Sequence, residues 1–332
     1  MTTAIDTDRP TASARSAHRR VGASDLHVFP MAISGNVFGW TSDVVATNAI
    51  LDAYTAGGGN FVDTADGYSA WVPGNSGGES ETIIGEWMSQ RGNRSDIVIG
   101  TKVSQHPDFK GLAAANVAAA ADASLKRLGT DYIDLYYAHF DDASVPLEET
   151  VTAFNDLLVA GKIRNVGVSN YTAERVSEWI AIAERNGFAL PVALQPHYNL
   201  VHRQTYEREL APVVAANKLG VVPYYGLASG FLTGKYRTAA DTEGKARGGG
   251  ATAYLNPEGL AVIDVLESVA DARGASIATT ALAWLLSRPN VVAPIASARV
   301  PEQLADLLAA PALELTSGEI AALDEVSLHI SE

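Results

Sequence analysis

Asp63 and Tyr68 are the first two residues in this sequence whose types and spacing could do chemistry. Asp63 interrupts a short apolar, β-prone run over residues 61–65, which follows the turn-forming residues 57–60. A carboxylate in a buried strand is costly unless a cation or hydrogen-bond donors meet it. Tyr68 follows in the loop that leaves this strand, so the pair predicts a proton-donor site. The alternative is a tight turn in which Asp63 only caps the backbone.

Lys102 and His139 stand at the ends of two later apolar runs and would complete such a site. A free phenol has a pKa near 10 and is a poor acid at neutral pH, but an ammonium beside it stabilises the phenolate and lowers that pKa. Lys102 could play this part for Tyr68, and Asp63 would neutralise the buried lysine. His139 could donate a hydrogen bond to the same substrate oxygen. Its alternative is a hydrogen-bonded histidine of the core.

Together the four side chains could protonate a carbonyl oxygen, but they cannot reduce the carbonyl carbon. No amino acid supplies hydride, so a nicotinamide cofactor would be required. The set contains no nucleophile paired with a base, which makes hydrolysis a poor fit. The chain has no cysteine, and no cluster of His and Asp ligands surrounds His139. Thiolate chemistry is therefore excluded, and we expect no metal site.

Apolar runs alternate with helical patterns along the chain, and this alternation predicts how the four side chains are positioned. Strands are predicted over residues 28–34, 61–65, 96–103, 132–139, 164–169, 191–195, 220–225 and 291–296. Helices are predicted over residues 43–56, 79–90, 113–128, 147–160, 173–186, 206–218, 258–273, 276–286, 301–309 and 317–326. Eight apolar strands separated by helices predict a parallel sheet closed into a (β/α)8 TIM barrel of the α/β class. A doubly wound open sheet is the alternative, but residues 35–39 lack its G-x-G-x-x-G signature.

A polar residue stands at the carboxyl end of every predicted strand. These residues are Asn36, Asp63, Lys102, His139, Ser169 with Asn170, Gln195, Tyr224 and Ser297. For any one of them, a loop side chain that faces water is the alternative. The carboxyl ends of barrel strands converge on one face, however, so the whole set predicts a shared pocket.

Composition limits the class of partner. The chain has 332 residues, a net charge of −14 and a pI near 4.9. A negative electrostatic field repels nucleic acid and anionic lipid, so we expect neither as a partner. Composition does not exclude a homo-oligomer. Residues 1–17 are rich in Thr, Ala, Ser and Asp without an apolar stretch, which predicts a disordered tail rather than a signal peptide. Residues 18–332 are predicted to form one domain, beginning with a small hairpin over residues 19–27, in a cytoplasmic protein.

Several motifs together resemble the aldo-keto reductase superfamily over essentially all of the chain after residue 18. They are N-F-V-D-T-A at residues 60–65 with Tyr68, T-K at 101–102, A-H at 138–139, G-V-S-N at 167–170, Gln195, and a segment over residues 227–236 similar to L-x-x-G-x-L-T-G-K-Y. The resemblance implies an NADPH-dependent carbonyl reductase in which Asp63, Tyr68, Lys102 and His139 are the catalytic residues and the substrate is a small carbonyl compound. It also implies which residues hold NADPH: Ser169, Asn170, Gln195, Tyr224, Leu227, Ser229, Gly230, Leu232, Lys235, Ile295, Ser297, Arg299, Gln303 and Asp306.

Some positions depart from the family pattern. Gly226 follows two tyrosines where the family often has Ser-Pro, and Ser297 stands where some branches have Lys or Gly. Arg299 is therefore our candidate for the 2′-phosphate of NADPH, because a guanidinium pairs with phosphate in a forked geometry. The loop over residues 233–257 is interpreted as a flap over the cofactor, with a solvated linker as the alternative. The residues expected to wall the substrate pocket, or else to pack in the ordinary way, are Trp40, Trp71, Phe140 and Tyr171.

Two other functions compete with the reductase. The same family includes channel-associated β subunits that resemble reductases, so a nucleotide-binding regulatory subunit with little turnover is the first alternative. The intact set of Asp63, Tyr68, Lys102 and His139 argues against it. A hydrolase or lyase that works without nucleotide on the same barrel is the second.

Overall fold

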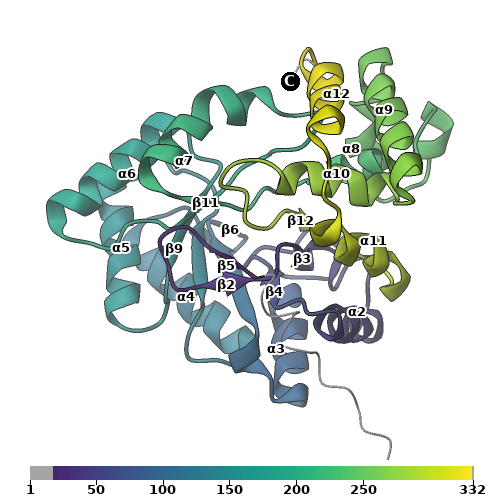
Figure 1. The fold of residues 1–332 in the computed structure, drawn as a ribbon. Helices are drawn as coiled ribbons and strands as arrows, with labels where there is room; N and C mark the ends of the chain where they lie inside the picture. Colours follow the sequence, from purple (N-terminus) through teal and green to yellow (C-terminus); the bar gives the residue numbers. More distant parts are fainter. Residues whose placement is uncertain (1–17, 331–332) are drawn as a thin grey trace, which may run out of the picture.

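The computed structural model describes residues 18–330 and shows an eight-stranded parallel barrel (Figure 1). The order in the sheet is β11-β10-β9-β8-β5-β4-β3-β12. A parallel bridge between Val221 and Val291 joins the last strand segment back to β11 and closes the ring. The strands are β3 (Ala32–Ser34), β4 (Phe61–Asp63), β5 (Val98–Val103), β8 (Leu135–Ala138), β9 (Val166–Ser169), β10 (Ala193–Gln195), β11 (Gly220–Val221) and β12 (Ile295–Ala296). The predicted (β/α)8 barrel is thus confirmed, while the predicted tail lies outside the described residues.

Helices surround the strands, as Figure 1 shows. They are α2 (Val44–Ala56), α3 (Glu79–Arg91), α4 (Ala114–Leu128), α5 (Leu147–Val159), α6 (Ala173–Asn186), α7 (Ala211–Asn217), α8 (Gly248–Thr252), α9 (Pro257–Arg273), α10 (Ile277–Leu286), α11 (Leu304–Ala309) and α12 (Ser317–Ser327). Side-chain caps fix several starts: the Asp43 carboxylate accepts from Ala46 N, and the Thr172 hydroxyl accepts from Arg175 N. Because such capping residues can be recognised in the sequence, the predicted helix starts lie close to the observed ones.

Shorter helical turns link these elements. They are η1 (Gly35–Val37), η2 (Arg94–Asp96), the π-helical turn η3 (Thr205–Leu210), η4 (Ala228–Thr233), η5 (Ala239–Thr242), η6 (Pro301–Gln303) and η7 (Ala310–Ala312). One predicted helix, over residues 206–218, is split into η3 and α7. Pro212 lies at the start of α7 and has no N–H to donate, so regular hydrogen bonding is interrupted there.

Two hairpins are added to the barrel. β1 (Arg19–Arg20) pairs antiparallel with β2 (His27–Val28), which confirms the hairpin predicted there. It lies across the amino-terminal ends of the strands (Figure 1), where a Cβ on Gly22 would stand 2.2 Å from Val192 O. The second hairpin, β6 (Gln105–His106) with β7 (Phe109–Lys110), follows β5 and was not predicted.

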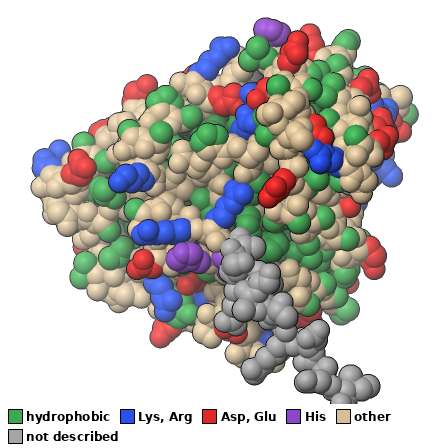
Figure 2. All heavy atoms as spheres, viewed as in Figure 1, with side chains coloured by type: hydrophobic (Ala, Val, Ile, Leu, Met, Phe, Trp, Pro, Cys, Tyr) green, Lys and Arg blue, Asp and Glu red, His purple; other side chains and the backbone are tan. Residues whose placement is uncertain are grey.

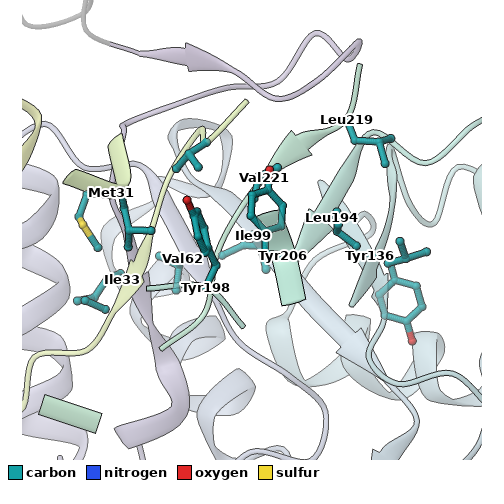
Figure 3. Close-up of a cluster of buried hydrophobic side chains, with 14 of the residues drawn as sticks. Met31, Ile33, Val62, Ile99, Tyr136, Leu194, Tyr198, Tyr206, Leu219 and Val221 are labelled. Carbon is teal, nitrogen blue, oxygen red and sulfur yellow. The ribbon is translucent and has the colours of Figure 1, made fainter. Parts of the chain in front are cut away.

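The core has two layers because successive strand residues point to opposite faces. Between the strands and the helices lies a large cluster that includes the side chains labelled in Figure 3, among them Ile33, Val62, Ile99 and Leu194 from neighbouring strands. Inside the barrel lies a smaller cluster whose members from the strands and hairpin include Ala32, Phe61, Leu135, Tyr137, Ala193, Val21 and Val28. The hairpin side chains therefore close the barrel interior from below.

Charged side chains are dispersed on the face of the molecule shown in Figure 2, where acidic and basic groups intermingle. Among the described residues, no helix combines the length and apolar character that a membrane crossing would need.

Candidate active site

Strand alternation points the predicted site residues into the mouth of the barrel. In β4, Phe61 belongs to the interior cluster and Val62 to the outer one, so Asp63 points inward again. The same alternation in β5 turns Ile99 and Val103 outward and Lys102 inward, and in β8 it turns Ala138 outward. His139 follows β8 on the inward side. Because every strand runs in the same direction, these inward residues meet at one end.

Lys102 lies at the centre of this group. Its Nζ donates to Asp63 Oδ2 at 2.8 Å, to the carbonyl oxygen of Thr64 at 2.6 Å and to the Tyr68 hydroxyl at 3.2 Å. Gln195 Nε2 donates to the other carboxylate oxygen of Asp63 at 2.9 Å. Lys102 and Asp63 are both buried. A buried ion pair is tolerated when its remaining hydrogen-bonding groups are satisfied, and here they are.

The electrostatics of Tyr68 differ from the expectation. Burial would lower the pKa of Lys102, but the neighbouring Asp63 carboxylate and Tyr68 outweigh it, so the pKa is raised and the ammonium persists. For Tyr68 the balance is reversed: burial raises its pKa, and the opposing effect of Lys102 is smaller, so the net pKa is above the ordinary value. The predicted lowering by Lys102 exists but does not prevail in this structure. The phenol is consequently protonated at neutral pH and available as a proton donor.

His139 is neutral at physiological pH. Burial, reinforced by the Lys102 ammonium, brings its pKa well below the ordinary value. Its Nδ1 is buried without a hydrogen-bond partner among the described residues, and its ring centroid is 6.2 Å from that of Tyr68. His139 lines the same cavity as Tyr68, so it is not simply a histidine of the core. A neutral imidazole carries one N–H and can still donate to an oxygen placed between the two rings.

A second hydrogen-bond network fixes the amides beside the site. Asn170 adopts a left-handed backbone conformation with φ of 56° and donates from Nδ2 to the His139 carbonyl oxygen at 2.8 Å. The Tyr224 hydroxyl donates to Asn170 Oδ1 at 2.7 Å, and the Ser169 hydroxyl donates to the Gln195 carbonyl oxygen at 2.8 Å. Ser169 is itself buried, so it supports the amides from beneath.

These groups lie in a cavity of about 850 Å³. Most of the predicted site residues line it: Asp63, Tyr68, His139, Asn170, Gln195, Tyr224, Leu227, Ser229, Gly230, Lys235, Ile295, Ser297, Arg299, Gln303, Asp306, Trp71 and Phe140. Lys102 lies just behind Asp63 and Tyr68, where it is bonded to both.

Besides Lys102, four predicted residues do not line the cavity. Ser169 and Leu232 are buried beneath it, and Leu232 is part of the outer core. Tyr171 was predicted as a wall of the substrate pocket, and this is corrected: it is buried, with its ring 5.8 Å from that of Trp179. Trp40 acts only indirectly, since its ring meets that of Trp71 edge to face at 5.7 Å.

The sequence alone did not assign Arg247 a place in the site. Its guanidinium donates to Asn36 Oδ1 at 2.8 Å and to Ser297 Oγ at 3.2 Å, which connects the loop after β11 to the ends of β3 and β12. Lys245 lines the cavity as well. This part of the loop therefore packs against the strand ends and is not simply a solvated linker, while its part as a mobile flap over the cofactor stays a prediction.

Four cationic side chains line the cavity on the side of the loops that follow β11 and β12. They are Lys235, Lys245, Arg247 and Arg299. Burial lowers the pKa of Lys235, and the charges of Arg299, Arg247 and Lys245 lower it further. None of the four forms an ion pair with another described residue. Mutually repelling cations without carboxylate partners, in a chain of net charge −14, could form a site for a polyanion.

A buried carboxyl group lies behind the loop that carries Tyr68. Neither carboxyl oxygen of Asp66 has a hydrogen-bond partner among the described residues. The nearby Arg127 is occupied, since its Nε donates to Glu81 Oε2 at 2.7 Å. Burial, together with the Glu81 carboxylate, raises the pKa of Asp66 to about 8. Asp66 is therefore mainly protonated at neutral pH.

Replacing Asp66 with asparagine is expected to remove a pH dependence of stability. The folded-state pKa lies above that of the unfolded chain, so the protonated carboxyl contributes stability at low pH that is lost as the pH rises through about 8. Between pH 6 and pH 8 the wild type should lose about 2 kcal/mol that Asp66→Asn retains. Urea unfolding across this range measures the difference. Parallel curves for the two proteins would show that Asp66 titrates as in the unfolded chain.

Known proteins are similar to this chain over most of its length. The model of the aldo/keto reductase family matches residues 33–328. A probable voltage-gated potassium channel subunit beta of Oryza sativa subsp. japonica is 34% identical over 299 residues, covering 87% of this chain and 89% of that protein. Norsolorinic acid reductase B of Dothistroma septosporum is 33% identical over 335 residues, covering 94% and 82%. Aldo-keto reductase YhdN of Bacillus subtilis is 32% identical over 292 residues, covering 86% and 84%.

The similarity to the family model covers most of the chain. It extends over nearly the whole barrel, and the relatives include named reductases. The chain belongs to the aldo/keto reductase family and is an oxidoreductase that acts on carbonyl groups.

Proposed function

We propose that this protein is an NADPH-dependent aldo-keto reductase that reduces an aldehyde or ketone, and oxidises the alcohol in reverse, with Tyr68 as the general acid. The observation that carries the proposal is the contact of the Lys102 ammonium with both Asp63 and the Tyr68 hydroxyl, at 2.8 Å and 3.2 Å, at the edge of a large cavity. Bound NADPH would supply hydride to the carbonyl carbon.

The chain's own residues would handle the proton. The Tyr68 hydroxyl would give its proton to the carbonyl oxygen, and the Lys102 ammonium would stabilise the phenolate that remains. Asp63 keeps Lys102 charged and in place. His139 would donate a hydrogen bond to the same oxygen, orienting the carbonyl toward Tyr68. In the reverse direction, the Tyr68 phenolate would accept the proton of the alcohol.

The cavity has the groups that a dinucleotide would require. The unpaired cations Lys235, Lys245, Arg247 and Arg299 would meet its phosphates. Tyr224 would lie against the nicotinamide ring, and the amides of Asn170 and Gln195 would border its carboxamide. Gln303 at the end of η6 and Asp306 in the first turn of α11 would hold the adenosine end. We infer NADPH rather than NADH from the cation count and from Arg299.

Purified protein, NADPH and a panel of aldehydes and ketones test the proposal directly. We expect NADPH to bind and to be oxidised with at least one carbonyl compound. Tight NADPH binding with negligible turnover on every substrate would favour a regulatory subunit, in keeping with the relatives that are named channel β subunits. Conversion of a carbonyl substrate without added NADPH would favour a hydrolase or lyase. Absence of NADPH binding would contradict both nucleotide-dependent functions.

Arg299→Ala is expected to raise the Kd for NADPH by about tenfold or more and to leave the Kd for NADH nearly unchanged. Charge-assisted hydrogen bonds contribute about 1.5–3 kcal/mol, and only NADPH carries the 2′-phosphate that would receive them. Binding titrations with the two nucleotides measure the ratio, and NADH serves as the internal control. Equal weakening of both would place Arg299 on a group that the nucleotides share.

A cytoplasmic location and a small-molecule carbonyl substrate belong to the same proposal.

A further inference from the structure

Exposed aromatic side chains concentrate at one place on this protein. The large hydrophobic residues that stay exposed in the described chain include three aromatic ones, Trp71 at 52%, Tyr225 at 48% and Phe140 at 41% exposure. All three line the cavity that contains Tyr68. They come from separate places in the chain, so no single element explains why they meet. Clustered exposed apolar surface usually marks a binding site.

Two of the three rings border the reacting groups, and Tyr225 lies against Tyr224, with ring centroids 5.2 Å apart. The Trp71 ring centroid is 6.2 Å from that of Tyr68, and the Phe140 centroid is 4.8 Å from that of His139. Trp71 is braced by its edge-to-face contact with Trp40. Tyr225 is held in the left-handed region at φ of 55°, where its carbonyl oxygen accepts from Asn199 Nδ2 at 2.9 Å. A non-glycine residue in that region is strained and is retained where the surrounding structure requires it.

The β6–β7 hairpin brings a cation to the same mouth. Its backbone lies on the loop of Tyr68, because a Cβ on Gly67 would stand 3.0 Å from the carbonyl carbon and oxygen of Gln105. Lys110, on β7, lines the cavity, is exposed and forms no ion pair with another described residue. β5 and its hairpin stand across the barrel from β11 and β12, so Lys110 is separate from the four cations of the polyanion site.

The acidic groups near the hairpin are Asp108, Asp141 and Asp142. Asp141 is paired with Arg175 at 2.6 Å. Asp142 accepts from Leu112 N at 2.9 Å and from the Ser144 backbone N–H at 3.0 Å, which fixes the base of the hairpin. Asp108 is exposed and lies outside the cavity lining. Lys110 is thus the charged residue of the hairpin that borders the cavity.

We infer that the mouth formed by Trp71, Phe140, Tyr225 and Lys110 is a substrate subsite for an aromatic aldehyde or ketone that carries an anionic substituent. The rings would hold the aromatic part of the substrate beside Tyr68 and His139, and Lys110 would attract the carboxylate or phenolate. This inference rests on the proposed reductase function. It adds that the substrate is planar and anionic.

The test compares benzaldehyde with its 2-, 3- and 4-carboxy derivatives as substrates, with NADPH present. For the best isomer, the wild-type kcat/KM should exceed that of benzaldehyde by up to about fivefold at low salt, the upper end of the effect of an exposed ion pair. The ratio should decline toward one at high salt. Lys110→Glu should bring the ratio below one, because it replaces attraction by repulsion. Lys126→Glu makes the same charge change at an exposed site on α4 outside the cavity and should preserve the wild-type ratio.

Trp71→Leu tests the aromatic part of the subsite. Leucine keeps apolar contact but has no ring, so benzaldehyde should lose its advantage over cyclohexanecarbaldehyde in kcat/KM. A wild-type ratio that does not respond to salt or to Lys110→Glu would overturn the subsite and leave the reductase intact. Absence of turnover with every one of these aldehydes would overturn the reductase proposal together with the subsite.

Discussion

Tyr68→Phe is expected to reduce kcat for carbonyl reduction by about 10³-fold, within the usual contribution of a positioned general acid or base. The phenol is the protonated group that contacts Lys102 at the edge of the cavity, and phenylalanine offers no proton. The ring itself is kept, so its contacts with Trp71 and His139 should persist. NADPH oxidation under saturating carbonyl substrate measures the loss.

The same variant should bind NADPH with a Kd close to that of the wild type. The proposed phosphate-binding cations lie on the loop after β11 and after β12, and Tyr68 contributes no charge to them at neutral pH. A nucleotide titration of Tyr68→Phe therefore separates loss of chemistry from loss of binding. Unchanged turnover in this variant would rule out Tyr68 as the proton donor.

Lys102→Met is expected to abolish turnover and also to destabilise the fold by about 3–5 kcal/mol. The substitution leaves the Asp63 carboxylate buried with only Gln195 as a donor, and it leaves the Thr64 carbonyl without its partner. An uncompensated buried charge costs far more than the net value of the pair it came from. Urea unfolding together with the turnover assay measures both effects.

The double variant Asp63→Asn with Lys102→Met provides the matched control. It removes both charges, so much of the stability lost in Lys102→Met should return while turnover stays absent. The asparagine can still accept from Gln195 Nε2. If the double variant is no more stable than Lys102→Met, the stability cost arises from packing around the lysine stem rather than from the unpaired Asp63.

The sequence predicted the barrel because the relevant signals are local. A strand buried on both faces is apolar, and a helix typically begins at a capping residue and ends near a glycine. Each strand and each helix can therefore be recognised from its own residues. The strand ends were overestimated where few residues pair: of the predicted strand over residues 220–225, only Gly220–Val221 form regular strand, and Tyr224 adds an isolated bridge to His197. In the first predicted strand, Pro30 has no N–H to contribute, and β2 and β3 are separate.

The grouping of the proposed catalytic residues was predictable for a related reason. Every second residue of a barrel strand points into the barrel interior. The carboxyl ends of the parallel strands also converge on one face of the barrel. Asp63, Lys102 and His139 therefore had to lie together once the barrel was accepted. The β6–β7 hairpin escaped prediction because its four paired residues show no sustained alternation.

What the sequence by itself determined is the barrel, the family and the identity of the groups that meet at its mouth. Only the tertiary structure decided that Arg247 joins Asn36, 211 residues away, that Tyr171 lies in the core, and that burial outweighs Lys102 in setting the Tyr68 pKa. Periodicity and strand direction are carried by neighbouring residues. Loop contacts and the depth of burial depend on all the elements packed around a group, and no local pattern encodes them.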